Sequence, residues 1–336
     1  MSTAAIQKLI DDNQKILIIQ ADNPDGDSLA SALALEQILG DMDKQPSLYC
    51  GVDIPTYLRY LSGWDRVDNQ LPKDFDTSIV VDASAQVLLE RLSNDPNKSL
   101  LKQKPCLVID HHSSPPTIDF ADIKHIKPAV ATGELIYDLS QKFKWPLNLA
   151  AKEFLAVSIM SDSLGLVSEG TTAHSIKVIA ELVEGGVSLA KLEDARRNMM
   201  RKSPELLAYK GRLLQRIEFY DNNRIVTITI PWSEIEKYSP LYNPTMLVLD
   251  EMRFGENTDV AIGFKTYRDG RITAKIKTNY GKAIADKLAE HFGGGGHPYA
   301  SGFKVTDGRT INEIKKECIA LASALLDNLD KDHATT

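Results

Sequence analysis

The chain has 336 residues, 43% of them hydrophobic and 25% charged, so we expect a globular protein large enough for two domains. Its 46 acidic and 39 basic residues give a net charge of −7, which argues against wrapping long duplex nucleic acid but allows a short anionic ligand in a local basic pocket. The three cysteines, Cys50, Cys106 and Cys318, are widely spaced and lack C-x-x-C spacing, so they indicate neither a disulfide framework nor a zinc knuckle.

The first residues do not resemble a targeting segment. Asp11, Asp12 and Lys15 lie where a signal peptide would have its apolar region, and no later apolar stretch is long enough to cross a bilayer. We therefore expect a cytoplasmic protein without a membrane partner.

Strand-like apolar runs alternate with helix-like patterns in the first half of the chain. The expected strands cover residues 15–21, 47–52, 78–81 and 105–109, and the expected helices cover residues 28–39, 132–143 and 149–160. This alternation predicts an α/β fold with a mostly parallel sheet and helices on both faces. In such sheets ligands gather at the edge where the carboxyl ends of the strands meet.

The first candidate motif, Asn-Pro-Asp-Gly-Asp at residues 23–27, directly follows the first expected strand. Only Gly26 separates Asp25 from Asp27, so both carboxylates can leave one tight loop toward neighbouring cations. We expect Ser28 to cap the following helix. The spacing excludes an EF-hand, while a plain turn before a helix is the alternative, because Asp, Gly and Pro all favour turns.

Two further motifs follow strand-like runs. Asp82 comes directly after residues 78–81, where an acid has no packing role, although a solvated strand end is the alternative. Asp110, His111 and His112 follow residues 105–109, and two adjacent imidazoles beside an acid form an uncommon group, with a polar loop as the alternative.

We expect these motifs to meet, because Asp25, Asp82 and His111 all come just after strands of one sheet. Asp162 follows an apolar helix, a position where polar residues are common, and is weak evidence by itself. Carboxylates with one or two imidazoles and no thiolate favour Mn²⁺ or Mg²⁺ over zinc. Two such ions about 3.5–4 Å apart are usual in the hydrolysis of phosphate esters.

The pattern changes after Gly185 and Gly186, and a charged stretch follows. We predict a first domain over residues 1–186, a linker over 187–205, a second domain over 206–329 and a polar tail over 330–336. In the second domain we expect helices over residues 204–219, 245–253, 282–291 and up to about 329, and strands over 224–230, on both sides of 268–270 and over 302–305.

Four glycines and a histidine in the second domain, Gly293, Gly294, Gly295, Gly296 and His297, allow the backbone to approach an anion closely. The lysine of a Walker loop is missing, and a glycine helix terminator is the alternative. The surroundings are basic, with Arg253, Arg268, Arg271, Lys275, Lys277 and Lys282. We expect several of these to line a solvated face, and we select Lys277 and Arg253 as phosphate contacts.

In this order along the chain, the motifs resemble those of the DHH/DHHA1 phosphoesterases, most closely the nano-RNases that also dephosphorylate 3′-phosphoadenosine 5′-phosphate (pAp). The similarity covers nearly the whole chain, including residues 79–82, 161–163 and 293–303. It implies an N-terminal DHH domain and a smaller α/β DHHA1 domain whose glycine-rich loop, with Gly294, Gly295, Gly296 and His297, grips the substrate.

The resemblance also implies roles in the first domain. Asp82 would bridge two Mn²⁺ ions, with Mg²⁺ as the alternative. Asp25 would serve the first ion, and the second would be completed by Asp27, His111 and Asp162. His112 would contact the scissile phosphate, and Asp110 would orient the histidines.

The chain departs from the family pattern at three places. Ala21 stands where the family has a histidine ligand of the first metal, Leu166 and Val167 replace an aromatic-arginine pair, and Lys277 replaces an arginine. The loss at Ala21 leaves three outcomes open: a need for high Mn²⁺, a single metal, or lost activity.

We therefore expect a Mn²⁺-dependent phosphoesterase that degrades short oligoribonucleotides to mononucleotides and dephosphorylates pAp. One alternative is a phosphodiesterase of linear or cyclic signalling dinucleotides. Another is a weakened nucleotide-binding homologue that lost its first metal through Ala21. The expected partner is a short single-stranded oligonucleotide or nucleotide, and a homodimer stays open.

Overall fold

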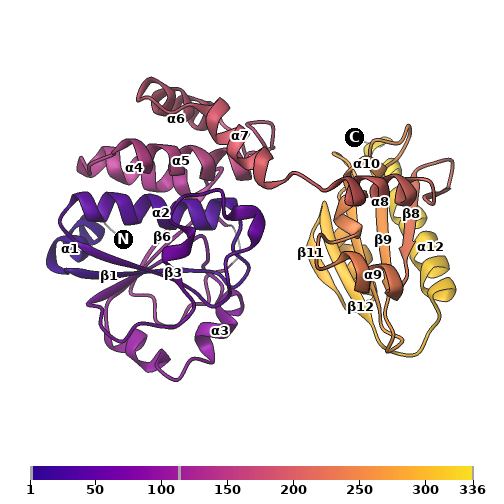
Figure 1. Ribbon diagram of the computed structural model, residues 1–336, viewed down its shortest axis with the longest axis horizontal. Helices are drawn as coiled ribbons and strands as arrows, with labels where there is room; N and C mark the ends of the chain where they lie inside the picture. The colour runs from indigo at the N-terminus through magenta and orange to yellow at the C-terminus, as the bar shows by residue number, and fades with distance from the viewer. Residues whose placement is uncertain (1–2, 113–114, 335–336) are drawn as a thin grey trace. The chain divides into compact units, whose positions relative to one another are not determined.

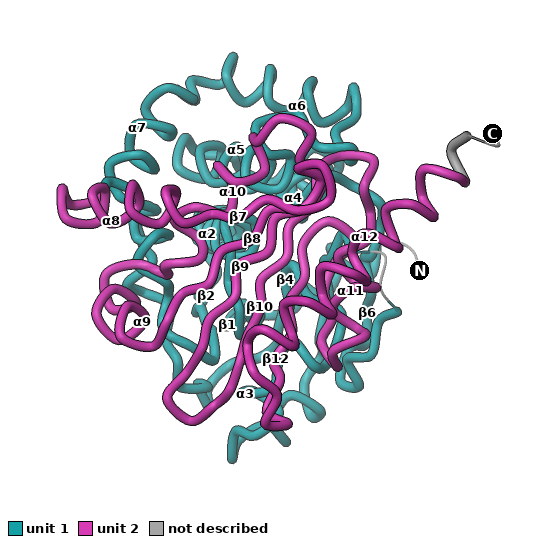
Figure 2. Tube along the Cα trace, turned by 90° about the vertical axis from the view of Figure 1, so that its right-hand side faces the viewer, with its two compact units in different colours: residues 1–201 teal, residues 202–336 magenta. Residues whose placement is uncertain are grey.

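The computed structural model describes residues 3–112 and 115–334. It divides into two compact units, residues 1–201 and residues 202–336 (Figure 2). Among the described residues, no helix has both the length and the apolar character needed to span a membrane.

The first unit is built on a six-stranded parallel sheet with the strand order β3-β2-β1-β4-β5-β6. The strands are β1 (Lys15–Gln20), β2 (Gln45–Cys50), β3 (Val67–Asp68), β4 (Thr77–Val81), β5 (Cys106–Asp110) and β6 (Ile123–Ile126). The helices are α1 (Ala4–Asp12), α2 (Gly26–Asp41), α3 (Glu90–Ser93), α4 (Thr132–Phe143), α5 (Leu149–Asp162), α6 (Ala173–Glu184) and α7 (Leu189–Met199).

The central strand β1 is buried on both faces, and its alternate side chains enter two different cores. Ile16 and Ile18 pack with α2, α4 and α5, which lie together on one face of the sheet (Figure 1). Leu17 and Ile19 pack on the other face, where α3 and short 3₁₀ turns cover the strands. The predicted parallel sheet with helices on both faces is therefore confirmed.

Helix α2 lies between the sheet and α5, and this position explains its composition. Ala30, Ala32 and Ala34 are completely buried, as are the leucines around them. A helix that is apolar on every side is one buried on every side. Because α2 begins directly after the loop that contains Asp25, the rigid core of this unit also fixes the position of the first acidic motif.

The second unit contains a mixed six-stranded sheet with the strand order β11-β12-β10-β9-β8-β7, in which only β8 and β9 are parallel. The strands are β7 (Glu218–Tyr220), β8 (Ile225–Ile230), β9 (Val260–Thr266), β10 (Ile272–Thr278), β11 (Gly295–His297) and β12 (Ala300–Val305). The helices are α8 (Pro204–Leu214), α9 (Trp232–Tyr238), α10 (Leu249–Met252), α11 (Ala285–His291) and α12 (Ile311–Ala334).

The predicted linker over residues 187–205 contains α7, which Ser188 caps through its hydroxyl oxygen and whose charged side chains lie on its exposed surface. Two helix predictions need correction. The helix predicted over 204–219 ends at Leu214, since residues 218–220 pair with β8. The helix predicted over 245–253 is a 3₁₀ turn followed by the short α10.

Strand β6 buries a histidine, and this predicts acid sensitivity. Burial, and to a lesser extent Lys127, lowers the pKa of His125 to about 4. Its stabilising contribution is complete above the unfolded pKa of about 6.5 and is lost as the pH falls toward 4. His125→Gln should therefore reduce the fall in unfolding free energy between pH 7 and pH 4.5 by about 2–3 kcal/mol, measured by urea denaturation. His291→Gln, at an exposed position, is the control, and equal pH dependence in both variants would contradict the prediction.

Candidate metal centre

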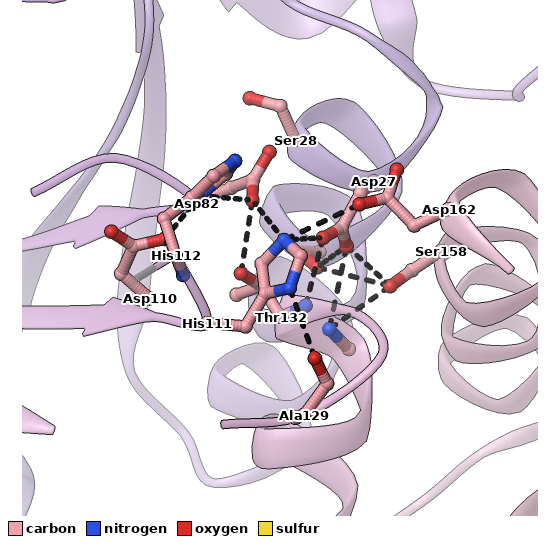
Figure 3. Close-up of polar contacts among 12 residues, drawn as sticks. Asp27, Ser28, Asp82, Asp110, His111, His112, Ala129, Thr132, Ser158 and Asp162 are labelled. Carbon is pink, nitrogen blue, oxygen red and sulfur yellow. Dashed lines mark hydrogen bonds and ion pairs between the residues drawn. The ribbon is translucent and has the colours of Figure 1, made fainter. Parts of the chain in front are cut away.

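The acidic and imidazole motifs lie at one edge of the first sheet. Strands β1, β4 and β5 are neighbours, and their carboxyl ends lead into residues 25–27, Asp82 and residues 110–112. Helix α5 brings Asp162, its last residue, to the same place. The convergence expected from parallel strand ends is therefore present in the structure (Figure 3).

His111 lies at the centre of this group. Its Nε2 atom is 3.3 Å from Asp162 Oδ2, 3.4 Å from Asp82 Oδ1 and 3.6 Å from Asp27 Oδ2 (Figure 3). Its Nδ1 atom lies 3.1 Å from the carbonyl oxygen of Ala129 and can donate its proton there. This bond fixes the tautomer that leaves a lone pair on Nε2, as in metal-binding histidines.

Asp27 is fully buried and is held by three helices. Its Oδ1 atom accepts hydrogen bonds from the hydroxyls of Ser31 on α2, at 2.9 Å, and Ser158 on α5, at 2.5 Å. Its Oδ2 atom accepts a bond from the backbone N–H of Thr132, at the start of α4, at 2.8 Å. Burial, and then the charge of Asp162, raises the pKa of Asp27, so this carboxylate favours a nearby cation.

Asp82 is buried and has a strained backbone. Its φ of +57° lies in the left-handed region, which Asp and Asn enter more readily than most residues. The hydroxyl of Thr132 donates to Asp82 Oδ1 at 3.1 Å. Burial, followed by the charge of Asp27, raises the pKa of Asp82 well above its usual value. A strained backbone at a buried carboxylate that lies close to other carboxylates is typical of a functional position.

Asp110 and His112 form a separate pair beside the central group. The fully buried Asp110 accepts bonds at Oδ1 from His112 Nδ1, at 2.7 Å, and from the backbone N–H of His112, at 3.2 Å. The bond to Asp110 raises the pKa of His112. Burial opposes ionisation of Asp110, but the bonds from His112 lower the pKa of Asp110. The partly exposed His112 therefore keeps its proton to higher pH than an ordinary histidine, and only its Nε2 is left for a ligand.

Asp25 caps the helix that follows its loop, and its role as a metal ligand stays a prediction. Its Oδ1 atom accepts a bond from the backbone N–H of Ser28 at 3.0 Å, so Asp25 is the N-cap of α2. The prediction that Ser28 caps this helix is wrong, because α2 begins at Gly26, before the apolar pattern starts. Ala21 is buried on the opposite face of the sheet from α2, in the core that contains Leu17.

The donor groups fit a divalent cation. In the described part of the chain, two groups of side chains have ligand atoms within 4.8 Å of one another: Asp27, His111 and Asp162, and Asp82, His111 and His112. The Nε2 atom of His111 is buried and has no hydrogen-bond partner among the described residues. Burial opposes its protonation, yet Asp162 and Asp82 raise the pKa of His111, so the surrounding carboxylates favour a positive charge here. Carboxylates and imidazole without thiolate suit Mn²⁺ or Mg²⁺.

Sequence reasoning missed the residues that hold the ligands in place, Thr132, Gly133 and Ser158. The hydroxyl of Ser158 accepts a bond from the backbone N–H of Gly133 at 2.9 Å while it donates to Asp27. The start of α4 at Thr132-Gly133 was the available signal, because free N–H groups at a helix start bind carboxylates.

Gly133→Ala is expected to weaken cation binding about tenfold, the usual effect of disturbing groups that hold a metal ligand. A methyl group at this position would lie 2.1 Å from Ser158 Oγ and would push Ser158 away from Asp27. Calorimetric titration with Mn²⁺ measures the change. Gly40→Ala on α2 is the control, since no atom lies within 4 Å of the added methyl group. Unchanged affinity in Gly133→Ala would contradict this role for Ser158.

The second unit holds the other predicted site residues. Lys277 Nζ and Arg253 Nη2 both contact Asp250 Oδ1, at 2.8 Å and 3.2 Å. Arg253 Nη1 also donates to the carbonyl oxygen of Thr278 at 3.1 Å. These two cations therefore share one carboxylate and leave one net positive charge, and their contact with a phosphate stays a prediction.

The glycine run is not an open loop throughout. Residues 295–297 form β11, and His297 pairs with Ala300 on β12. A side chain at Gly294 would lie 2.2 Å from the carbonyl oxygen of Gly302, and Gly296 has a φ of +144°. The close backbone pairing of this hairpin explains two of the glycines, so a helix terminator, the alternative considered for this run, does not account for all of them. Substrate binding by Gly294, Gly295, Gly296 and His297 stays a prediction.

Comparisons with known proteins place these features in a family context. Residues 15–170 match the model for the DHH family, N-terminal domain. The bifunctional oligoribonuclease and PAP phosphatase NrnA of Thermus thermophilus is 25% identical over 83% of this chain and 81% of its own length. The protein of the same name from Bacillus subtilis is 23% identical over 84% and 86%. An exopolyphosphatase-related protein from Bacteroides fragilis has the same fold, with a TM-score of 0.84 and 20% identity over 96% and 97% of the two chains.

Proposed function

Since residues 15–170 form an N-terminal domain of the DHH family, we propose that this hydrolase of phosphoester bonds is Mn²⁺-dependent and degrades short oligoribonucleotides to mononucleotides, with pAp as a second substrate. The main support is the unpartnered Nε2 atom of His111, which faces three carboxylates. The relatives named oligoribonuclease and PAP phosphatase support nucleotides as the substrate class.

The residues of the centre have distinct parts in this proposal. Asp27, Asp82, Asp162 and His111 would hold the cation. When bound, a divalent cation supplies Lewis acidity, which neutralises phosphate charge and makes water a nucleophile at neutral pH. Thr132 fixes the orientation of the Asp82 carboxylate through its hydroxyl.

His112 supplies the proton in this scheme. Asp110 holds Nδ1 at 2.7 Å and keeps the imidazole protonated, so the Nε2–H group of His112 can donate to the phosphate or to the departing oxygen. The leaving group of a nucleotide ester is an alkoxide, which departs more easily when it receives a proton.

The direct test is an assay of the purified chain on labelled dinucleotides, five-nucleotide RNA, pAp and cyclic dinucleotides with Mn²⁺, with Mg²⁺ and with EDTA. We expect mononucleotide release with Mn²⁺ and none with EDTA. A ranking that places cyclic or 5′-phosphorylated linear dinucleotides first would favour the signalling alternative. Bound Mn²⁺ without turnover of any of these substrates would refute the proposal.

Ala21→His separates the proposal from a silent binding module. A buried methyl group occupies this position, and it supplies no donor atom. If the native centre suffices, restoring an imidazole should change the rate on pAp little. A large rise from near zero would instead mean that the chain in its present form binds nucleotides without cleaving them.

A further inference from the structure

A groove lies on one face of the sheet in the second unit. Its cavity volume is about 500 Å³, and its lining includes Lys265, Lys275, Lys304 and Thr245. Helices α11 and α12 pack on the opposite face, around Ile272, Ala274 and Ile276. Helices α8, α9 and α10 cover β8 and part of β9 on the groove's own face. The groove therefore occupies the part of this face that these helices leave uncovered.

The strand register brings the three lysines onto the same face. Lys265 on β9 and Lys304 on β12 both pair with Thr273 on β10, so the three residues form one row across three strands. Residues directly opposite each other in antiparallel strands point to the same face, as do residues two apart along a strand. Lys275, two residues beyond Thr273, therefore projects from the same side.

Small residues form the floor around Lys275. Its partners in the neighbouring strands are Gly263 and Gly302, and Gly302 pairs in turn with Gly295. A side chain at Gly263 would lie 2.2 Å from Thr245, and one at Gly302 would lie 2.7 Å from the carbonyl oxygen of Ala274. Close packing thus requires two of these glycines. Lys275 itself is exposed, and its partners in both neighbouring strands carry no side chain.

The groove is positively charged and lacks a counterion. None of the described residues that line it is acidic. The Nζ atom of Lys265 is held at 2.7 Å from Asn243 Oδ1, which also accepts a bond from the backbone N–H of Thr245. Burial, and then the charge of Lys275, lowers the pKa of Lys265, so the ammonium groups repel each other across the groove.

The three lysines of the groove are distinct from the two cations that were selected as phosphate contacts. Lys277 and Arg253 differ from this set, because both already contact Asp250.

We infer that this lysine groove binds phosphate groups of a short single-stranded oligonucleotide, beyond the phosphate assigned to Lys277 and Arg253. The inference rests on the proposed function for the nature of the substrate. Lysines on a flat surface suit a flexible phosphodiester chain, since an ammonium group is a point charge that imposes little geometry.

Binding of labelled RNA to the full chain without metal tests the inference. In EDTA, fluorescence anisotropy with a five-nucleotide RNA should show that Lys275→Gln weakens binding roughly fivefold and lowers the dependence on log salt by about 0.7. The combined replacement of Lys265, Lys275 and Lys304 by glutamine should have a larger effect in the same direction. Lys287→Gln is the control, because it removes one charge from an exposed position on α11, which packs on the opposite face.

Three outcomes decide the matter. Equal affinity and equal salt dependence for the wild type and Lys275→Gln, with unchanged thermal melting, would overturn the inference. So would a variant that loses affinity only for inorganic phosphate in calorimetry, because the groove would then serve a free anion. RNA binding that depends on Lys275 in a chain that hydrolyses no phosphoester would support the inference and refute only the proposed function.

Discussion

Asp82→Asn is expected to lower phosphoesterase activity about a thousandfold while it raises the unfolding temperature of the metal-free protein. The activity falls because the neutral amide of asparagine lacks the negative charge of the Asp82 carboxylate, whose Oδ1 atom lies between His111 and Thr132. The stability rises because burial and the neighbouring Asp27 make the ionised Asp82 unfavourable without a cation. Asparagine also tolerates the left-handed backbone at φ +57°.

Differential scanning fluorimetry with EDTA and with Mn²⁺ measures both effects. Mn²⁺ should raise the melting temperature of the wild type and leave that of Asp82→Asn nearly unchanged. Asp82→Ala is the matched control, because alanine removes the charge but is strained in the left-handed region, so it should gain less stability. Wild-type turnover in Asp82→Asn would remove this residue from the centre.

Asp110→Asn should lower kcat about a hundredfold or more and shift the pH profile. The Asp110 carboxylate raises the pKa of His112, so it keeps the imidazole protonated to higher pH. If protonated His112 donates to the leaving oxygen, activity falls as the pH rises through this pKa. Loss of the carboxylate should move that fall to lower pH, and the amide also favours the wrong tautomer.

The profile of kcat against pH between about 6 and 9 gives the result. Asp138→Asn is the control, since Asp138 forms a similar pair with His174, 2.9 Å apart on the surface helices α4 and α6. It should leave the profile unchanged. A drop in rate without a shift of the alkaline limb would mean that Asp110 only supports the local structure.

The sequence allowed the first unit to be predicted well, for clear physical reasons. Helix α4 has the predicted bounds, because its apolar period is complete and the chain leaves the helix at Lys144, which is left-handed. The strands that lead to Asp82 and His111 were recognised because they are buried on both faces and therefore continuously apolar. Their position at one edge followed from parallel topology alone.

The remaining features depend on contacts between distant segments, which spacing does not reveal. The cap of α2 was predicted at Ser28, yet one oxygen of Asp25 forms it, while the role of Asp25 as a metal ligand stays a prediction. The role of Ser158 depends on a helix that lies 131 positions after Asp27 in the chain. The lysine groove could not be predicted for the same reason, because its lysines come together only through the pairing of β10 with β9 and β12.

Because α2 is buried on every side, the packing of the first unit determines where its candidate metal ligand Asp27 lies. Asp27 is in the first turn of this helix, and the partners that hold it come from α4 and α5. A small sideways or axial displacement of α2 therefore changes the distance between Asp27 and His111. Replacing a buried alanine such as Ala32 by a larger residue should therefore change the reaction rate, although no substrate reaches this position. The packing of α2 and the activity of this unit therefore depend on the same residues.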